Sequence, residues 1–259
     1  IIKDTMVLIQ PIFQNASDKN IQSRLINALY GIAQGIHESY MTKEIFSANL
    51  LEHILSLTSG SDVSLEDKLN CFDILTVIVS NSRVITKTMI DTINIPDTVL
   101  NCLNSYSKSP AAALHETLMF VPNEILLRVS RFIALLMPPE KMQMISTLQY
   151  VDEDPEPIDG DKLESLVSQL TPVFVDIYMN SMDIQVRKTV LLTLLRFISS
   201  IKPNTSGKNH VDKDLARLIG SALAQNKKHV SDDKIVPADI GILIFGTVQL
   251  ATYLIEKYF

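Results

Sequence analysis

Apolar residues recur at steps of three and four along most of the chain, the pattern of amphipathic α-helices. In the segment from 180 to 200, Val190, Leu194 and Phe197 lie on one such stripe, and further leucines widen it beyond a single narrow face. A helix this apolar must be covered on two sides, as happens where helices stack in layers. Asp183 precedes the stripe, where its carboxylate can accept hydrogen bonds from the first-turn amides. A helix is therefore predicted to begin there.

Similar stripes return along the chain and predict further long helices. The predicted ranges are about 19 to 37, 65 to 80, 123 to 137, 183 to 201 and 238 to 257. Asp18 and Asp62 stand before the first two at the offset of Asp183, although Asp73 falls where the other segments place leucines. The residues expected to be buried between layers are Leu25, Leu29, Ile32, Leu69, Phe72, Val190, Leu194 and Phe197.

Shorter amphipathic segments precede the long ones and complete a repeat. Asn49 and Asn94 stand where a further short helix turns into the next, a place that favours left-handed backbone angles. Three helices in about 40 to 47 residues are typical of armadillo repeats. The sequence therefore predicts an all-α armadillo-type α-solenoid of about five three-helix units with irregular insertions.

The predicted domains follow from where this regularity fails. Residues 1–137 hold three armadillo-like units, and residues 162–259 hold two further armadillo or HEAT-like units. Between them, residues 138–161 form an acidic, proline-containing linker. This linker is interpreted as solvated, with an acidic patch for a basic partner as the alternative.

Composition narrows the functional classes. The net charge of −6 gives nucleic-acid phosphates no general attraction, so no nucleic-acid partner is expected. The uncharged run from 240 to 255 is shorter than the roughly 20 residues that a membrane span needs. We therefore expect a buried helix and no membrane partner. The chain lacks an initiator methionine and still has helical character at its end, so it is interpreted as a piece of a longer protein.

Candidate catalytic chemistry is sparse. No metal-binding or nucleotide-binding motif is present, so neither a metal nor another cofactor is expected. Cys71 and Cys102 lie in apolar helical segments without a nearby histidine or cation in sequence. Buried free thiols in a reducing compartment are the interpretation, and the fragment is predicted to be non-catalytic.

The succession of segments also resembles a known family. TMVLIQPIFQNASDKNIQSRLINALYGIAQGI, TKEIFSANLLEHIL, CFDILTVIVSNSRVITKTMIDTINIPDTVLNCL and HETLMFVPNEILLRVSRFIALLMPP resemble the armadillo region of the HECT-type ubiquitin ligases of the ubiquitin-fusion-degradation pathway. The animal relatives are the thyroid-receptor-interacting ligases. Those relatives carry a tryptophan-rich domain where this chain has its acidic segment and no tryptophan, so the chain looks more like a fungal member.

The resemblance implies a role in a larger ligase. Its catalytic cysteine would lie in a C-terminal HECT domain outside this fragment. The fragment would receive degron-bearing substrates, including N-degrons, and ubiquitin or ubiquitin chains that the ligase elongates. A ubiquitin-conjugating enzyme would bind the rest of the chain, and the location would be cytoplasmic or nuclear. The alternative is a freestanding armadillo scaffold or transport adaptor, although the tryptophan ladder of peptide-binding adaptors is absent.

A solenoid exposes an extended surface, so polar residues outside the apolar stripe of the long helices are the candidate partner-binding residues. These are Asn27, Tyr30, Gln34, Asn70, Asp73, Arg128, Arg131 and Arg196. Arg128 and Arg131 are three apart on one helical face and could grip a carboxylate or a backbone carbonyl. The alternative is that these side chains are ordinary solvated positions or bond to neighbouring helices.

Overall fold

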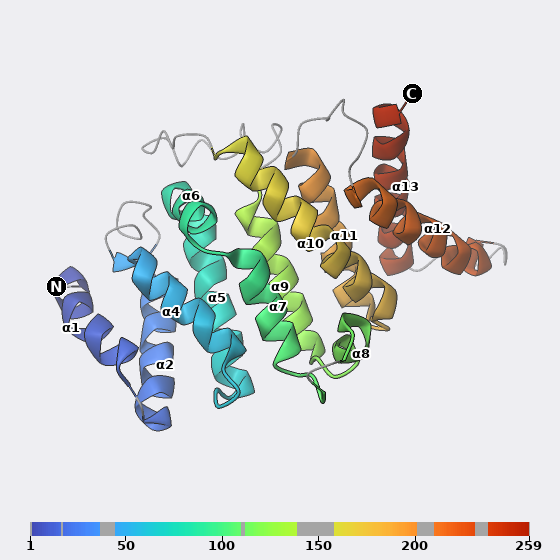
Figure 1. The fold of residues 1–259 in the computed structure, drawn as a ribbon. Coiled ribbons are helices and arrows are strands. Elements are labelled where there is room, and N and C mark those ends of the chain that lie inside the picture. Colours follow the sequence, from blue (N-terminus) through green and yellow to red (C-terminus); the bar gives the residue numbers. More distant parts are fainter. Residues whose placement is uncertain are drawn as a thin grey trace. The chain divides into compact units, whose positions relative to one another are not determined.

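The computed structural model describes residues 2–16, 18–36, 45–109, 112–138, 158–200, 210–230 and 238–258. Every regular element in these ranges is a helix (Figure 1), so the predicted all-α class is confirmed. The chain divides into two compact units, the first with helices α1 to α7 and the second with α8 to α13. The acidic residues 152 to 156 of the predicted linker lie outside the described residues.

The first unit is built from two layers of helices. Its helices are α1 (Ile2–Gln14), α2 (Lys19–Gly35), α4 (Ala48–Ser59), α5 (Leu65–Asn81), α6 (Arg83–Thr92) and α7 (Ile95–Asn104). α2 packs beside α5 in one layer, and α4 packs against both α5 and α7. Phe13, Leu29, Ile54 and Phe72 are among its fully buried side chains. Apolar faces buried between layers are the arrangement that the wide stripes predict.

Capping explains where the long helices of this unit begin. Asp18 caps α2 as predicted, accepting hydrogen bonds from the amides of Asn20 and Ile21. The prediction for Asp62 is wrong, because Ser64 caps α5: its hydroxyl accepts from the Asp67 amide and donates to the Asp67 carboxylate. The first of these bonds satisfies an amide that has no partner within the helix, and the second holds the Ser64 hydroxyl in position. Asp62 instead forms an exposed ion pair with Lys19 at 3.8 Å.

Counting from the observed caps brings the long helices into a common register. The eleventh residue after the cap is Leu29 in α2, Leu75 in α5 and Leu194 in the fourth predicted unit, and each is fully buried. Asp73 is half-buried. It is the eleventh residue after Asp62, so it falls at the leucine position only if Asp62 is taken as the cap. Moving the cap from Asp62 to Ser64 therefore places Leu75, and not Asp73, in register with Leu29 and Leu194.

The predicted turns at Asn49 and Asn94 need correction. Asn49 lies inside α4, which is capped by Ser47. Asn94 caps α7 with φ of −77°, outside the left-handed region, and its side-chain oxygen accepts from the Asp97 amide. Asn94 is therefore at a helix start because of its side-chain acceptor and not because of an unusual backbone angle.

The second unit has the same layered organisation. Its helices are α8 (Leu114–Leu118), α9 (Asn123–Leu136), α10 (Gly160–Asn180), α11 (Ile184–Ser200), α12 (His210–Val230) and α13 (Ala238–Tyr258). α9, α11 and α13 lie side by side in one layer, while α10 and α12 form the other. Phe132 is fully buried, and the rings of Phe174 and Phe197 meet edge to face with centroids 5.5 Å apart.

The predicted long helices agree closely with α2, α5, α9, α11 and α13. Within each unit they lie next to one another, α2 with α5 and α9 with α11 and α13. The expected burial is confirmed for Leu29, Phe72, Val190, Leu194 and Phe197. Leu25, Ile32 and Leu69 are only half-buried, because they lie on the flank of their stripes. The solenoid architecture is compatible with these layers, and the repeat boundaries stay a prediction.

The expectation of a buried helix near the end of the chain holds for one face only. On α13, Leu243, Thr247 and Leu250 are buried, whereas Phe245 is 64% exposed. Ile242, Val248 and Ile255 are exposed as well. The apolar stretch from Ala238 to Glu256 is 22% buried and long enough, by length and composition alone, to cross a membrane. The stretch reaches this length only by including Asp239 and Glu256, the charged residues that bound the uncharged run.

Candidate functional site

The polar face of α2 and α5 is held together by an amide pair. The side-chain nitrogen of Asn70 donates to the side-chain oxygen of Asn27 at 2.9 Å. One turn earlier, the hydroxyl of Ser23 donates to the carboxylate of Asp67 at 2.8 Å. These contacts fix the side chains of two predicted binding residues across neighbouring helices. The Asn27 amide nitrogen and the Asn70 carbonyl oxygen could still bond to a polypeptide backbone.

The other predicted residues of this face lie near the pair in sequence. Tyr30 is half-buried and Gln34 is exposed on α2, while Asp73 is half-buried on α5. The structure therefore brings the candidate residues of the first unit onto two helices in contact. Their chemistry is that of hydrogen bonding to polar protein groups and not of bond cleavage.

The three candidate arginines lie in the second unit. On α9, Arg128 is half-buried and Arg131 is exposed. On α11, the guanidinium of Arg196 donates to the backbone carbonyl of Ala134 on α9 at 2.8 Å. One hydrogen-bond donor of Arg196 therefore links the two helices. This agrees with the alternative that the candidate side chains bond to neighbouring helices. Arg131 presents its guanidinium at the surface, where a carboxylate could accept two hydrogen bonds from it.

α9 and α11 form a well-fixed platform for these arginines. The Thr193 hydroxyl donates to the Ser130 carbonyl at 3.0 Å, a buried contact halfway along both helices. At their starts, the Asn123 amide donates to the Asp183 carboxylate at 3.2 Å. Asp183 also caps α11 as predicted, accepting from the amides of Gln185 and Val186. These contacts fix the two helices against each other, so the backbone positions of Arg128 and Arg131 are set before a partner binds.

Both cysteines have the properties of core residues. Cys71 and Cys102 are free thiols with no exposed surface. Burial, reinforced by the nearby Asp67 carboxylate, raises the pKa of Cys71 far above its usual range. Burial also raises the pKa of Cys102 to about 11, although Lys68 and a hydrogen bond with Thr58 act in the opposite direction. Neither thiol is suited to attack a ubiquitin thioester, because the thiolate is the nucleophile.

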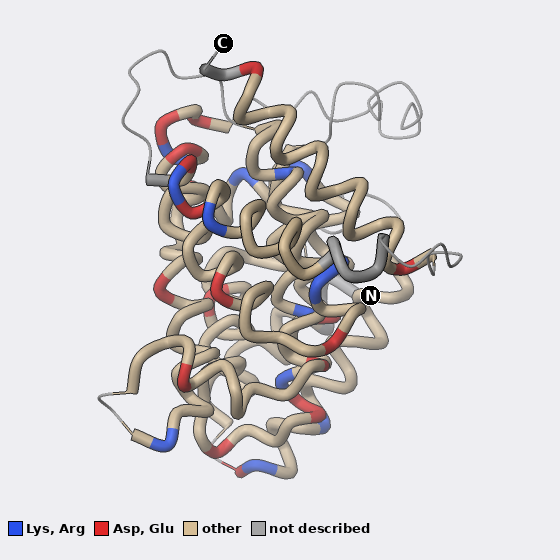
Figure 2. Tube along the Cα trace, turned by 90° about the vertical axis from the view of Figure 1, so that its right-hand side faces the viewer, with Lys and Arg blue, Asp and Glu red and all other residues tan. Residues whose placement is uncertain are grey.

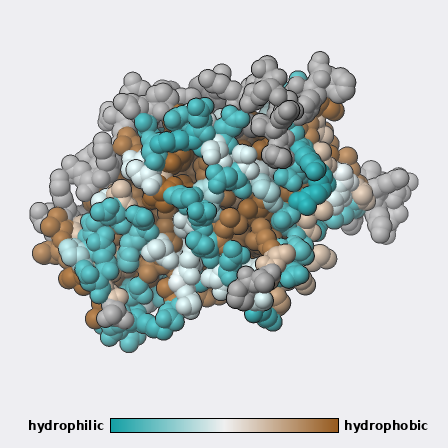
Figure 3. Space-filling model, in the orientation of Figure 1, coloured by the Kyte–Doolittle hydropathy of each residue, from teal (hydrophilic) through white to brown (hydrophobic). Residues whose placement is uncertain are grey.

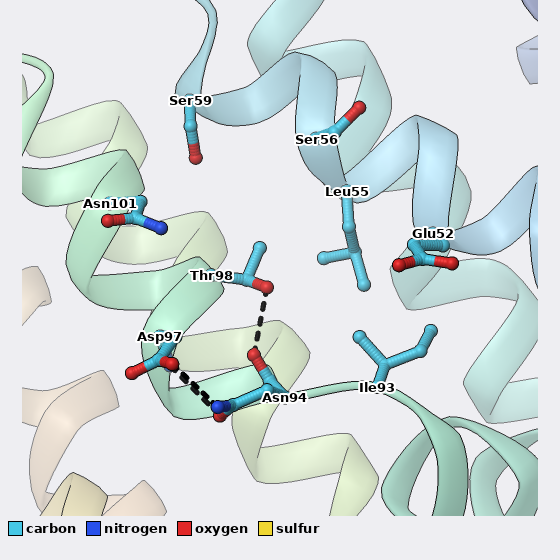
Figure 4. Close-up of a pocket in the computed structure, with 9 residues that line it drawn as sticks. All are labelled: Glu52, Leu55, Ser56, Ser59, Ile93, Asn94, Asp97, Thr98 and Asn101. Atoms are coloured by element: carbon cyan, nitrogen blue, oxygen red, sulfur yellow. Dashed lines mark hydrogen bonds between the residues drawn. The ribbon is translucent and has the colours of Figure 1, made fainter.

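A pocket with both polar and apolar lining, which the sequence did not indicate, lies in the first unit (Figure 4). It opens between α4 and α7 and has a volume of about 300 Å³. Its lining residues are Glu52, Leu55, Ser56, Ser59, Ile93, Asn94, Asp97, Thr98 and Asn101. Asn94 donates from its amide to the Asp97 carboxylate at 2.6 Å, so this edge of the pocket is fixed.

A weak signal for this pocket exists in the sequence. Glu52, Ser56 and Ser59 are spaced by four and three residues, which places them on one face of a helix. Asp97 and Asn101 have the same relation on α7. Polar stripes of this kind are usual on solvated helix faces. Only the packing of α4 against α7 turns two such stripes into a cavity.

Surface charge and hydropathy are mixed in both units. Figure 2 shows acidic and basic residues interspersed along the helices, with long uncharged stretches between them. Hydrophilic and hydrophobic side chains intermingle on the face seen in Figure 3. A mixed surface of this kind favours contacts with proteins over broad attraction to a polyanion.

Comparison with known proteins finds a relative that matches almost the whole chain. No model of a protein family matches the chain. The chain is 38% identical over 259 residues, 99% of its length, to Ubiquitin fusion degradation protein 4 from Saccharomyces cerevisiae. It spans 17% of the length of that relative. This match confirms the predicted resemblance to a fungal ubiquitin-fusion-degradation protein, and the armadillo assignment stays a prediction.

Proposed function

We propose that this chain, a relative of one region of a ubiquitin fusion degradation protein, is a non-catalytic protein-binding module of a HECT-type E3 ubiquitin ligase. In this role it holds a degron-bearing substrate or a ubiquitin chain for the ligase. A catalytic cysteine outside the 259 residues transfers ubiquitin to that substrate. The observation that carries the proposal is the 38% identity over 99% of the chain.

The geometry of the described helices supports a binding role. Cys71 and Cys102 are buried with raised pKa values, so neither supports thioester chemistry. The candidate polar residues lie on neighbouring long helices joined by side-chain contacts, such as the pair Asn27 and Asn70. Layered helices that present fixed polar side chains suit recognition of an extended partner.

We place the partner contact of the second unit at the α9 arginines. Arg131 is exposed, and Arg128 lies one helical turn before it. A guanidinium can bind a carboxylate through two hydrogen bonds and can also donate to backbone carbonyls. An acidic segment or a C-terminal carboxylate of a substrate would satisfy both requirements. The same module would serve ubiquitin-fusion degradation, N-degron recognition and ubiquitin-chain elongation in the cytoplasm or nucleus.

Charge reversal in the parent ligase tests this proposal. The Arg131→Glu variant, alone and with Arg128→Glu, should capture less of a ubiquitin-fusion substrate or ubiquitin chain in a pull-down assay. Lys213→Glu is the matched control, because Lys213 is an exposed cation on another helix, α12. Equal capture by Arg131→Glu, the double variant and the control would contradict the assignment of the α9 arginines.

A further inference from the structure

The pocket between α4 and α7 carries a charge pattern that selects its ligand. Glu52 on α4 and Asp97 on α7 are its two carboxylates, and none of its nine lining residues is basic. Glu52 and Asp97 are both exposed residues. An anion would therefore be repelled from the pocket, whereas a cation would be attracted.

The remaining lining adds an apolar surface and neutral hydrogen-bonding groups. Leu55 and Ile93 contribute aliphatic side chains, and Ser56, Thr98 and Asn101 contribute polar groups (Figure 4). The Ser59 hydroxyl oxygen is buried and has no hydrogen-bond partner among the residues that the structure describes. Because solvent does not reach this oxygen, no contact with a ligand is assigned to it.

We propose that this pocket binds the side chain of a lysine or arginine presented by a protein partner. The aliphatic stem would contact Leu55 and Ile93, and the cationic head would meet the Glu52 carboxylate beside them (Figure 4). Lysine and arginine combine these two characters, because their methylene stems pack on apolar surface while the charged head stays polar. This inference rests on the proposed role of the chain as a protein-binding module, and it adds a preference for basic residues.

The preorganisation of the pocket supports this ligand class. One Asp97 oxygen already accepts from Asn94 at 2.6 Å, and the Thr98 hydroxyl donates to the Asn94 carbonyl at 2.9 Å. The Asp97 carboxylate is thereby held in place, and its charge adds to the attraction of a cation to the pocket. The pocket opens to solvent, because Glu52, Asp97 and Asn101 in its lining are exposed. A side chain of a bound polypeptide can therefore enter it.

Short capped peptides test the inference on the 259-residue protein. Acetyl-Ala-Arg-Ala-amide and acetyl-Ala-Lys-Ala-amide are titrated into the ¹⁵N-labelled protein and followed by NMR. Norleucine and glutamate peptides of the same form are the matched ligands that lack the positive charge. We expect Kd values on the order of 1 mM for the basic peptides, a scale suited to one side chain. Shifts should concentrate at the amides of Asn94, Thr98 and Asn101.

Substitutions at Glu52 then separate binding from folding. Glu52→Gln should raise the Kd of the arginine peptide at least about fivefold, and Glu52→Lys should abolish its binding. Glu66→Gln removes an exposed carboxylate from α5, outside the pocket, and should leave the Kd unchanged. Melting temperatures of all three variants should match the unsubstituted protein.

Three results would overturn the inference: no localised shifts with either basic peptide, equal shifts with the norleucine peptide, or an unchanged Kd in Glu52→Lys. Failure here is distinguishable from failure of the proposed function, which is judged by substrate capture and by the α9 arginines. A ligase that loses capture on Arg131→Glu but shows no peptide binding at Glu52 would reject the pocket alone.

Discussion

Gly246 on α13 lies directly against Leu191 on α11. A Cβ atom at Gly246 would come within 2.5 Å of the Leu191 Cδ2 atom and within 2.9 Å of its Cγ atom. Gly246 is buried, and its lack of a side chain lets the two helices approach closely. This contact is reinforced near the start of α13, where Lys188 and Asp239 form a 2.7 Å ion pair.

Gly246→Ala should therefore destabilise the second unit, because either the helices or Leu191 must shift. We expect a loss of about 1 to 3 kcal/mol, the usual cost of overpacking. Gly220→Ala is the matched control, since nothing lies within 4 Å of a Cβ added there in α12. The control should gain about 0.5 to 1 kcal/mol from helix propensity. Denaturant unfolding measures both, and equal stabilisation by the two substitutions would show that α13 does not pack closely on α11.

Leu194→Ala should cost about 2 to 5 kcal/mol, the range for truncating a buried leucine. Leu194 has no exposed surface, whereas Leu192 on the same helix is 54% exposed. Leu192→Ala should change stability by less than about 0.5 kcal/mol, as for most surface substitutions. Chemical denaturation of the two variants compares them. A cost below half a kcal/mol for Leu194→Ala would mean that this side of α11 is not internal.

The helices could be predicted from periodicity, but their register could not. Asp18, Asp62 and Asp183 stand at similar positions before apolar stripes, yet only Asp18 and Asp183 cap their helices. At Asp62 the chain offers Ser64 as a competing cap with Asp67 three residues later. Several residues near a helix start can act as its N-cap. The residue that does so is the one that lets the apolar face of the helix meet the core.

Features that depend on neighbouring helices were the least predictable. The apolar run of α13 predicts a helix that is covered on both sides. Among the residues that the structure describes, only the face with Leu243 and Leu250 is buried. Likewise, Arg196 looks like a surface arginine in sequence and proves to bond with the Ala134 carbonyl. Which helix packs beside which face is set by tertiary contacts that no local pattern encodes.

Native alkylation tests the assignment of both cysteines to the core. At pH 8, Cys71 and Cys102 should resist iodoacetamide, because burial keeps both thiols protonated and out of reach. Both should be labelled in denaturant, as measured by mass spectrometry. For the same reason, the chain incubated with ubiquitin, activating enzyme and conjugating enzyme should form no thioester. A reducible ubiquitin adduct at either cysteine would show that the thiol is accessible.

His53 should make the first unit less stable in mild acid. Burial lowers the pKa of His53, although a backbone hydrogen bond with Phe13 opposes this. Its Nε2 atom is buried without a hydrogen-bond partner in the described part of the chain. The unfolded state therefore takes up the proton first, near its usual pKa of about 6.5. The stability contributed by neutral His53 is present above that pH and is lost as the pH falls towards the lower folded pKa.

The measurement is the melting temperature between pH 7.5 and 5.5 for the unsubstituted protein and His53→Gln. The variant should show a shallower decline, because glutamine does not titrate. All other residues are identical in the two proteins, so their contributions cancel in the comparison. Parallel declines would show that His53 is not buried as a neutral group.

The most direct test of the account is the affinity of the isolated 259-residue protein for ubiquitin-pathway ligands. Biolayer interferometry is run with an immobilised ubiquitin-fusion protein and, separately, with an immobilised ubiquitin chain. We predict saturable, reversible binding to at least one of them, weakened by Arg131→Glu and unaffected by Lys213→Glu, with no covalent adduct. The contradicting result is a protein that keeps its helical circular dichroism but binds neither ligand at concentrations up to about 100 μM. A Kd of about 100 μM corresponds to a binding free energy of roughly −5.5 kcal/mol. Such a result would contradict the assignment of this chain as the binding module of a ligase.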